Sequence, residues 1–361
     1  MLPRKQVRLD PRLPWLADLR ILLSPMSGVT DRAFRDCCRP FGMDMGFCEF
    51  ASAAGLCHEN EATWRLIDTE GEAGLVGIQI FGSAPEQMAA AARSMVGRRL
   101  DVLDLNFGCP AKKVVKKCGG SALLADVPLL ADIVQAVVAE SPVPVTAKIR
   151  SGWDDQSVNY QEVGLLLQEL GCVWVTLHSR TRHQKFRGEA DWTHIASLVE
   201  TLDIPVIGNG DVVDAATYRA LKSQTACYAV MVGRGAIGNP WLFQVMAAVE
   251  QGAPAPAPSW AEMCEVMSEY IRTEAASRGE RSGLLVTRKH IARCFRNYRG
   301  AAALRKRLFS AEFTTDMRAI LAEVGAAGQP LAESPELTNP GDSRQTRHEP
   351  DVDPATREGE P

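Results

Sequence analysis

Residues 103–110 read Leu-Asp-Leu-Asn-Phe-Gly-Cys-Pro, and residues 111–120 continue as Ala-Lys-Lys-Val-Val-Lys-Lys-Cys-Gly-Gly. The apolar run at 102–105 is typical of a buried strand, and Gly-Cys-Pro then forces a turn. Cys109 is therefore expected on a loop at the mouth of a sheet, followed by two glycines that leave the loop free to move. An isolated Gly-Cys-Pro is more often a small buried cysteine beside a basic loop, so the rest of the chain decides between the two interpretations.

Apolar runs of this kind recur along the chain, each ending in a glycine, a polar residue or a charge. They lie at residues 21–23, 46–48, 76–80, 102–105, 143–149, 173–177, 206–207 and 229–232. Helical patterns lie between them, at 85–98, 128–140, 160–170 and 215–223. Eight strand–helix units predict an α/β protein with a (β/α)₈ TIM barrel of roughly 250 residues. The alternative is a doubly wound open sheet, which usually has fewer strands, and no G-x-G-x-x-G follows the first run.

The composition is that of an ordinary globular protein, with 46% hydrophobic and 23% charged residues among 361. No apolar run is long enough to span a bilayer, and prolines and charges interrupt the first 19 residues, unlike a signal peptide. The ten cysteines are scattered without metal-ligand spacing, so no metal site is expected. We interpret them as reduced thiols in the cytoplasm.

The net charge of −4 hides an asymmetry along the chain. Residues 328–361 hold eight acidic and three basic residues with six prolines, which predicts a disordered acidic tail. Residues 281–308 carry nine Lys and Arg and no acid, which suggests an anionic partner. A Pro/Ala linker at 251–258 and a capping box beginning at Ser259 predict a helical domain at 259–327 after a barrel at 1–250.

Polar residues stand where the predicted strands end, which is where a barrel carries out its chemistry. The fifth strand ends in Lys148 and Arg150, and Lys148 is expected to point inward and meet a negative group, because an unpaired buried lysine is costly. Gly208-Asn209-Gly210 and Gly233-Arg234-Gly235 follow the seventh and eighth strands, the usual phosphate site of this fold. Glycine lets backbone N–H groups approach an anion, and Arg234 adds a charged donor. Two tight turns with a surface arginine are the alternative.

Together these residues resemble the tRNA-dihydrouridine synthases, flavin enzymes that reduce the C5=C6 bond of tRNA uridines. The resemblance runs from about residue 19 to 308, and it rests on the stretches 24–31, 77–82, 104–110, 120–124, 145–150, 178–182, 208–211 and 233–235. Residues 120–124, 288–290 and 300–308 look most like the bacterial B-type branch. In that family the barrel binds FMN and the helical domain binds tRNA, so the resemblance implies both here. Cys118 and the acidic tail lie outside the family pattern.

The resemblance also implies roles for single residues. Cys109 matches the family's catalytic acid, and Asn106 and Arg180 look like uracil-facing residues. Flavin contacts are implied for Pro25, Met26, Ser27, Gln79, Lys148, His178, Asn209, Gly210, Asp211, Gly233 and Arg234. Contacts with tRNA are expected from the basic helical segment, at Lys289, Arg293, Arg296, Arg305, Lys306 and Arg307.

The implied reaction reduces a D-loop uridine, with hydride passing from flavin N5 to uracil C6 and NADPH or NADH as the reductant. Cys109 would give the proton to C5, because a thiol with a reference pKa of about 8.5 is mostly protonated at neutral pH. The loop lysines at 112, 113, 116 and 117 would favour the thiolate unless they meet tRNA phosphates. The target base must leave its stack to reach the flavin.

Two other functions stay open from the sequence. One is a flavin-dependent small-molecule reductase of the dihydroorotate-dehydrogenase type, against which the basic helical domain argues. The other is a catalytically inactive RNA-binding relative, against which Cys109 and the complete flavin set argue. A monomer without a protein partner is expected.

Overall fold

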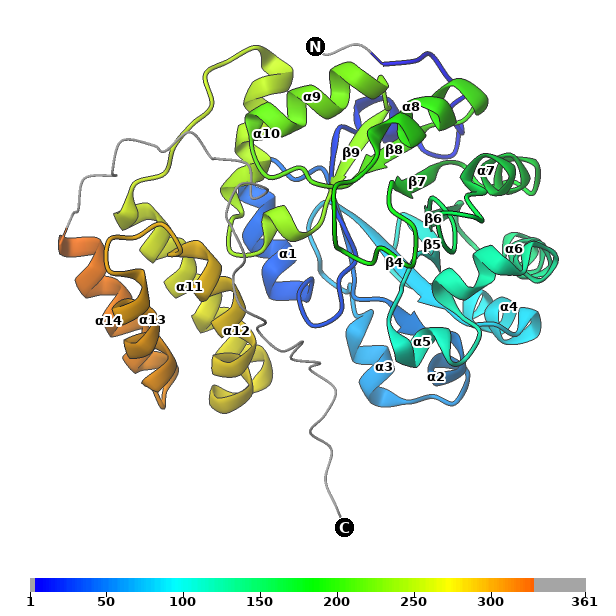
Figure 1. Cartoon of the computed structure of the whole chain (residues 1–361). Helices are drawn as coiled ribbons and strands as arrows, with labels where there is room; N and C mark the ends of the chain where they lie inside the picture. The colour runs from blue at the N-terminus through cyan, green and yellow to red at the C-terminus, as the bar shows by residue number, and fades with distance from the viewer. Residues whose placement is uncertain (1–3, 328–361) are drawn as a thin grey trace. The chain divides into compact units, whose positions relative to one another are not determined.

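The computed structural model describes residues 4–327, and its central feature is a closed barrel of parallel strands (Figure 1). The barrel consists of β1 (Ile21–Leu23), β2 (Met45–Phe47), β4 (Leu75–Phe81), β5 (Val102–Phe107), β6 (Val145–Arg150), β7 (Val175–His178), β8 (Val206–Asn209) and β9 (Ala229–Val232). The sheet closes because β9 pairs with β1 and β2 pairs with β4. The two-residue β3 (Ala51–Ser52) extends the end of β4. The predicted (β/α)₈ barrel is confirmed.

Helices surround the strands, and a single hydrophobic cluster fills the space between the two layers (Figure 1). The surrounding helices are α1 (Arg32–Cys38), α2 (Ala53–Cys57), α3 (Glu61–Leu66), α4 (Pro85–Arg93), α6 (Val127–Glu140), α7 (Tyr160–Glu169), α8 (Trp192–Thr201), α9 (Ala215–Thr225) and α10 (Trp241–Gln251). The short α5 (Lys112–Val115) lies in the loop after β5. Three of the four helical patterns in the sequence end within two residues of the observed helices, and α4 ends five residues early.

The barrel interior changes from apolar at its amino end to polar at its carboxyl end, as β5 illustrates. In β5, Leu103 and Leu105 pack outward in the cluster between strands and helices, so Asp104 and Asn106 point inward. Val102, at the start of the same strand, belongs to a different cluster that includes Trp174. The amino end of the barrel is therefore filled with apolar side chains, and the polar interior residues lie toward the carboxyl end.

Four more helices follow the barrel and enclose a hydrophobic cluster of their own. They are α11 (Trp260–Arg278), α12 (Glu280–Cys294), α13 (Ala301–Ser310) and α14 (Thr314–Ala327). Ser259 and Glu262 form the capping box that the sequence predicts. Trp241 of α10 joins this cluster, and the described residues belong to one compact unit, so the boundary at residue 250 stays a prediction. The predicted tail, 328–361, lies outside the described residues.

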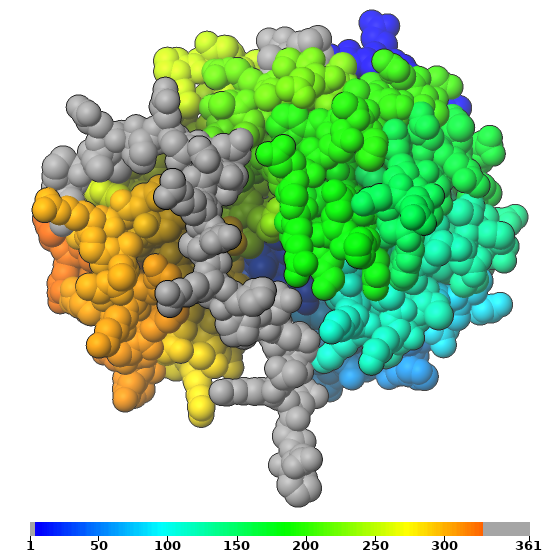
Figure 2. Space-filling model, viewed as in Figure 1, coloured from blue at the N-terminus to red at the C-terminus, as the bar shows by residue number. Residues whose placement is uncertain are grey.

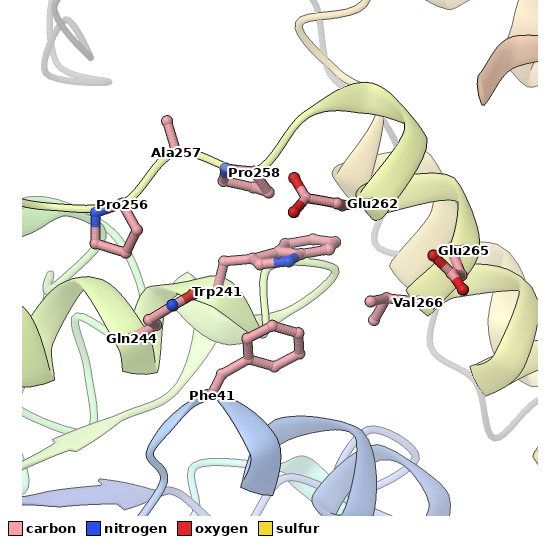
Figure 3. Close-up of a pocket in the computed structure, with 9 residues that line it drawn as sticks. All are labelled: Phe41, Trp241, Gln244, Pro256, Ala257, Pro258, Glu262, Glu265 and Val266. Atoms are coloured by element: carbon pink, nitrogen blue, oxygen red, sulfur yellow. The ribbon is translucent and has the colours of Figure 1, made fainter. Parts of the chain in front are cut away.

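A cavity of about 300 Å³ lies where the chain crosses from α10 to α11 (Figure 3). Figure 3 shows the rings of Phe41 and Trp241 beside Pro258, with Glu262 and Val266 of α11 facing them. Its lining contains no residue from the ends of the barrel strands, so we assign it no part in the chemistry. Among the described residues, no helix is both long and apolar enough to cross a membrane.

Gly238 controls how closely α12 approaches the loop after β9. Its φ is +65°, and a Cβ there would lie 2.1 Å from the carbonyl oxygen of His290 and 2.8 Å from the amide nitrogen of Cys294. Gly252 at the end of α10 has a similar φ of +69°, and a Cβ there would meet nothing within 4 Å.

We expect Gly238→Ala to destabilise the protein more than Gly252→Ala. Both substitutions strain a left-handed backbone, at a cost of about 1–2 kcal/mol. Only Gly238→Ala must also displace α12, which should add about 1–3 kcal/mol. Thermal and denaturant unfolding of the two variants measures the difference. Equal losses of stability in the two variants would show that the packing of α12 does not depend on its close approach to Gly238.

Candidate active site

The parallel strands bring the predicted site residues to the carboxyl end of the barrel. Gln79 lies on β4, Asn106 on β5, Lys148 on β6, His178 on β7 and Asn209 on β8. Neighbours in the register include Asn106 with Lys148 and His178 with Asn209. The loops that follow the strands add the remaining predicted barrel residues, which are Pro25, Met26, Ser27, Cys109, Arg180, Gly210, Asp211, Gly233 and Arg234.

The turn that carries Cys109 is held by side chains from both sides. Asn106 Oδ1 accepts hydrogen bonds from the backbone N–H groups of Gly108 (3.1 Å) and Cys109 (2.9 Å). Asn106 Nδ2 donates to Gln79 Oε1 (2.8 Å). On the other side, Ser121 donates to the carbonyl oxygen of Cys109 from its hydroxyl (2.9 Å) and its backbone N–H (3.1 Å). The position of Cys109 is thus defined by the strand before it and the turn after it.

Of the two glycines after the lysine-rich stretch, Gly120 packs against Cys109 and Gly119 packs against Gly82, so the structure gives both a packing role, and the expected freedom of the loop stays a prediction. Both are buried, and Gly120 has a φ of +59°. A Cβ on Gly120 would lie 2.8 Å from the carbonyl oxygen of Cys109 and 2.8 Å from Val114 Cγ1. The glycine is required for close approach.

The thiol of Cys109 keeps its proton at neutral pH. Burial raises the pKa of Cys109, and this effect exceeds the opposing influence of the Ala111 backbone N–H and of the charges on Arg150 and Lys148. The cations that act on the thiol therefore come from β6, whereas the sequence pointed to the loop lysines, which are exposed. A protonated thiol on an ordered turn is suited to general acid catalysis.

Arg150 joins the Cys109 turn to the loop after β7, a role that the sequence did not indicate. Its guanidinium donates to the carbonyl oxygens of Gly108 (2.7 Å), Thr181 (3.0 Å) and Lys185 (2.7 Å). It is 2% exposed, and burial lowers its pKa to about 10. A charged residue at the end of an apolar strand was the available signal, but its partners come from two distant loops.

Asp211 bridges two arginines at the ends of β7 and β9. It accepts from Arg180 Nη2 (2.6 Å) and from Arg234 Nη2 (3.3 Å). Arg180 also donates to the carbonyl oxygen of Gly188 (2.6 Å), and it is 2% exposed. Because a carboxylate repels a phosphate, Asp211 would act on one by orienting Arg234 and Arg180. Burial and the surrounding cations hold the pKa of His178 well below its ordinary value, so this imidazole is neutral.

The residues at this end of the barrel fit an anionic, phosphate-bearing ligand. Lys148 Nζ donates to Asn209 Oδ1 (2.9 Å), and burial together with Arg150 lowers the pKa of Lys148 to about 7. Among the described residues, the buried hydroxyl of Ser179 has no hydrogen-bond partner. Gly210 lies beside it, with a φ of +136° that only glycine adopts readily. A nearby anion would restore the charge of Lys148, and a ligand acceptor could satisfy Ser179.

A family model described as dihydrouridine synthase matches residues 22–327. The chain belongs to the dihydrouridine synthase family. The enzyme is therefore an oxidoreductase, because dihydrouridine is uridine with its C5=C6 bond reduced.

Named relatives of this dihydrouridine synthase cover most of the chain. The tRNA-dihydrouridine synthase B of Pasteurella multocida is 39% identical over 275 residues, which are 76% of this chain and 82% of the relative. The tRNA-dihydrouridine synthase B of Vibrio cholerae is 36% identical over 305 residues, 82% of this chain and 92% of its own. Among solved structures, a variant of NCR from Zymomonas mobilis matches with a TM-score of 0.45 at 16% identity, over 66% of this chain and 88% of its own.

The basic residues of the helices fall into two groups in this dihydrouridine synthase. Lys289 is half-buried, and its ammonium lies 3.7 Å from where a Cβ on Gly28 would stand, close to the carboxylates of Asp31 and Glu49. Arg293 donates to the carbonyl oxygen of Arg234 (3.4 Å) and so connects α12 to the loop after β9. The exposed group contains Arg296, Arg305, Lys306 and Arg307, of which the last pairs with Glu323. The orange surface in Figure 2 belongs to α13 and α14.

We expect alkylation of Cys109 by iodoacetamide to show a pH midpoint above the ordinary thiol value of about 8.5. Arg150→Met should move the midpoint higher, because it removes a cation that favours the thiolate and that, with a pKa of about 10, is still charged at this pH. Lys112→Met is the matched control and should leave it in place. Mass spectrometry that resolves each cysteine measures the profile and separates Cys109 from the exposed Cys118. A midpoint at or below 8.5 would contradict the assignment of a protonated thiol.

Proposed function

We propose that this enzyme reduces a uridine of tRNA to dihydrouridine, with FMN bound at the carboxyl end of the barrel, NADPH or NADH as the reductant and Cys109 as the proton donor. The observation that carries the proposal is the Cys109 thiol, which burial keeps protonated on an ordered turn beside Asn106. The relatives are named tRNA-dihydrouridine synthases, which supports tRNA as the substrate.

The residues around the opening divide into a set for the flavin ring and a set for its phosphate. Gln79, Lys148 and the residues after β1, Pro25 to Ser27, would contact the ring. Gly210, Gly233 and Arg234 would hold the phosphate, with Asn209 and Asp211 orienting the neighbouring cations. The neutral His178 adds no charge. When bound, FMN would supply the hydride for uracil C6.

Cys109 completes the reaction by protonating uracil at C5. Addition of hydride at C6 leaves negative charge on C5 and, by conjugation, on O4. The thiol proton passes to C5, the S–H bond breaks and a thiolate remains. Lys148 and Arg150 favour that thiolate, so the same cations that oppose burial in the resting enzyme stabilise the product of proton transfer. The thiolate then regains a proton from solvent.

The helices after the linker, 259–327, would hold the tRNA while its target base enters the barrel. A base inside its stack cannot reach the strand ends, so the nucleotide must be extruded. The exposed basic residues of α13 are placed to contact phosphates, whereas Lys289 is better placed to hold α12 on the loop after β1. All ten cysteines are free thiols, which fits a reducing compartment such as the cytoplasm.

We expect Cys109→Ala to abolish most dihydrouridine formation while keeping the flavin and tRNA affinity. General acids typically contribute about 10²–10⁴-fold. Mass spectrometry of tRNA incubated with reduced enzyme measures the product. Cys118→Ala is the matched control, because this second thiol is exposed in the same loop, and it should retain the wild-type rate. A normal rate for Cys109→Ala in the Cys118→Ala background would remove Cys109 as the acid.

We expect replacement of Arg305, Lys306 and Arg307 by Ala to weaken tRNA binding and flatten its dependence on salt. Binding releases counterions at each phosphate that a cation contacts, so a variant with fewer contacts releases fewer of them. The magnitude of the slope of log affinity against log salt should therefore decrease by about 0.7–0.9 for each contact that is lost. Titration at several salt concentrations measures both quantities.

The control for this charge change is a second triple variant on the barrel. Arg12, Arg93 and Arg219 are exposed, and replacing them by Ala removes the same charge. This control variant should leave the salt dependence of tRNA binding unchanged. Parallel slopes for the α13 variant and the wild type would move the tRNA contacts elsewhere on the protein.

A further inference from the structure

Asp104 is a buried carboxylate in the barrel that the proposed mechanism does not use. It lies on β5 between outward-facing leucines, is fully buried, and points into the barrel. Its register neighbours on the adjoining strands are Gln79 and Thr146. Thr146 Oγ1 donates to one carboxylate oxygen (2.5 Å) and Gln79 Nε2 to the other (2.6 Å). A buried charge is costly compared with an apolar side chain of the same size. The contacts of Asp104 therefore indicate a function that offsets this cost.

The contacts form a chain that runs from Asp104 to the Cys109 turn. Gln79 donates to Asp104 and accepts from Asn106 Nδ2 (2.8 Å). Asn106 in turn accepts from the backbone N–H groups of Gly108 and Cys109. A carboxylate only accepts hydrogen bonds and a backbone N–H only donates, so both ends demand the same orientation of the two amides. Asp104 supplies the terminal acceptor of this chain.

This series of hydrogen bonds determines which group Asn106 can offer to a ligand. Its carbonyl oxygen already accepts two hydrogen bonds, and one of its two N–H groups is given to Gln79. The remaining group is a donor, which matches a carbonyl oxygen such as uracil O4 and does not match the amino group that cytosine carries at that position. Negative charge builds on O4 during the reduction, so a fixed donor there would also stabilise the transition state.

We propose that Asp104 is a positioning residue that, through Gln79, holds Asn106 as a hydrogen-bond donor to the substrate carbonyl and holds the turn of Cys109 in place. The proposal rests on the proposed function for its substrate, but the positioning itself is a property of the chain of contacts. Asp104 makes no hydrogen bond to Asn106 or Cys109, and Gln79 is the link between them.

Three substitutions separate the acceptor from the charge and from local packing. Asp104→Leu removes the acceptor, and we expect the tRNA-dependent kcat to fall roughly 10–100-fold with little change in KM, as for misplaced catalytic groups. Asp104→Asn removes the charge but can still accept from Gln79 and donate to the hydroxyl of Thr146, so it should recover most of the loss. Thr146→Val is the matched packing control. It removes the other hydrogen bond to the same carboxylate and leaves Gln79 anchored.

A double variant tests whether Asp104 acts through Gln79. Gln79→Met breaks the link, so adding Asp104→Leu to it should have no further effect on kcat. If the two residues acted independently, the factors by which the two substitutions lower kcat would multiply. If Asp104 had a merely structural role, Asp104→Leu would lower kcat by the same factor with or without Gln79→Met. It would also lower the stability of the protein whether or not Gln79 is present.

A second readout does not need the flavin or the tRNA. The alkylation rate of Cys109 in flavin-free protein should rise several-fold in Asp104→Leu and stay near wild type in Asp104→Asn and Thr146→Val. Circular dichroism and melting temperature confirm that each variant folds, and Asp104→Asn with Gln79→Met remain informative if Asp104→Leu does not.

The outcomes distinguish the two proposals. Wild-type enzyme that fails to form dihydrouridine would overturn the proposed function, whereas the alkylation pattern would still report on positioning. Positioning by Asp104 is overturned if Asp104→Asn is as damaging as Asp104→Leu, because charge near Lys148 would then be the cause. It is also overturned if Thr146→Val matches Asp104→Leu, or if the effects of Asp104→Leu and Gln79→Met multiply.

Discussion

The pairing of β9 with β1 and of β2 with β4 closes the sheet, and the rest of the molecule depends on that closure. In a closed parallel barrel every strand delivers its last inward-facing side chain to the same opening. Apolar residues fill the amino end of the interior, so water is excluded below the polar layer. The polar side chains above must therefore satisfy one another, as Lys148 does with Asn209 and Asn106 with Gln79.

Strand positions could be predicted because each apolar run is short and sharply bounded. The runs at 21–23 and 229–232 coincide with β1 and β9. The run at 143–149 begins two residues before β6, because Pro144 has no N–H to donate to a neighbouring strand. The two-residue β3 has no pattern of its own, and it exists only because β4 extends far enough to pair with it.

The site was predictable as a set of residues and not as a set of contacts. Cys109, Lys148 and Asn209 stand at strand ends in the sequence and meet at the barrel opening in the structure. The partners of Asp104 depend on the register between three strands, which no single strand reveals. Likewise a helical pattern places Lys289 with the other basic residues, but the packing of α12 near Gly28 turns its ammonium toward carboxylates.

The balance of charge around the opening explains how one site can bind anions and still keep an acid protonated. Lys148, Arg150 and the two arginines at Asp211 outnumber the carboxylates, which favours an anionic ligand. Of these cations, Arg150 and Lys148 act to lower the pKa of Cys109, and burial keeps it raised in the resting protein. An anion bound near Lys148 would favour the charged form of that lysine, so the added negative and positive charges would largely offset each other at the thiol. Burial would therefore still keep the proton on Cys109 when a ligand is bound, and the charge that builds on the substrate would draw that proton away.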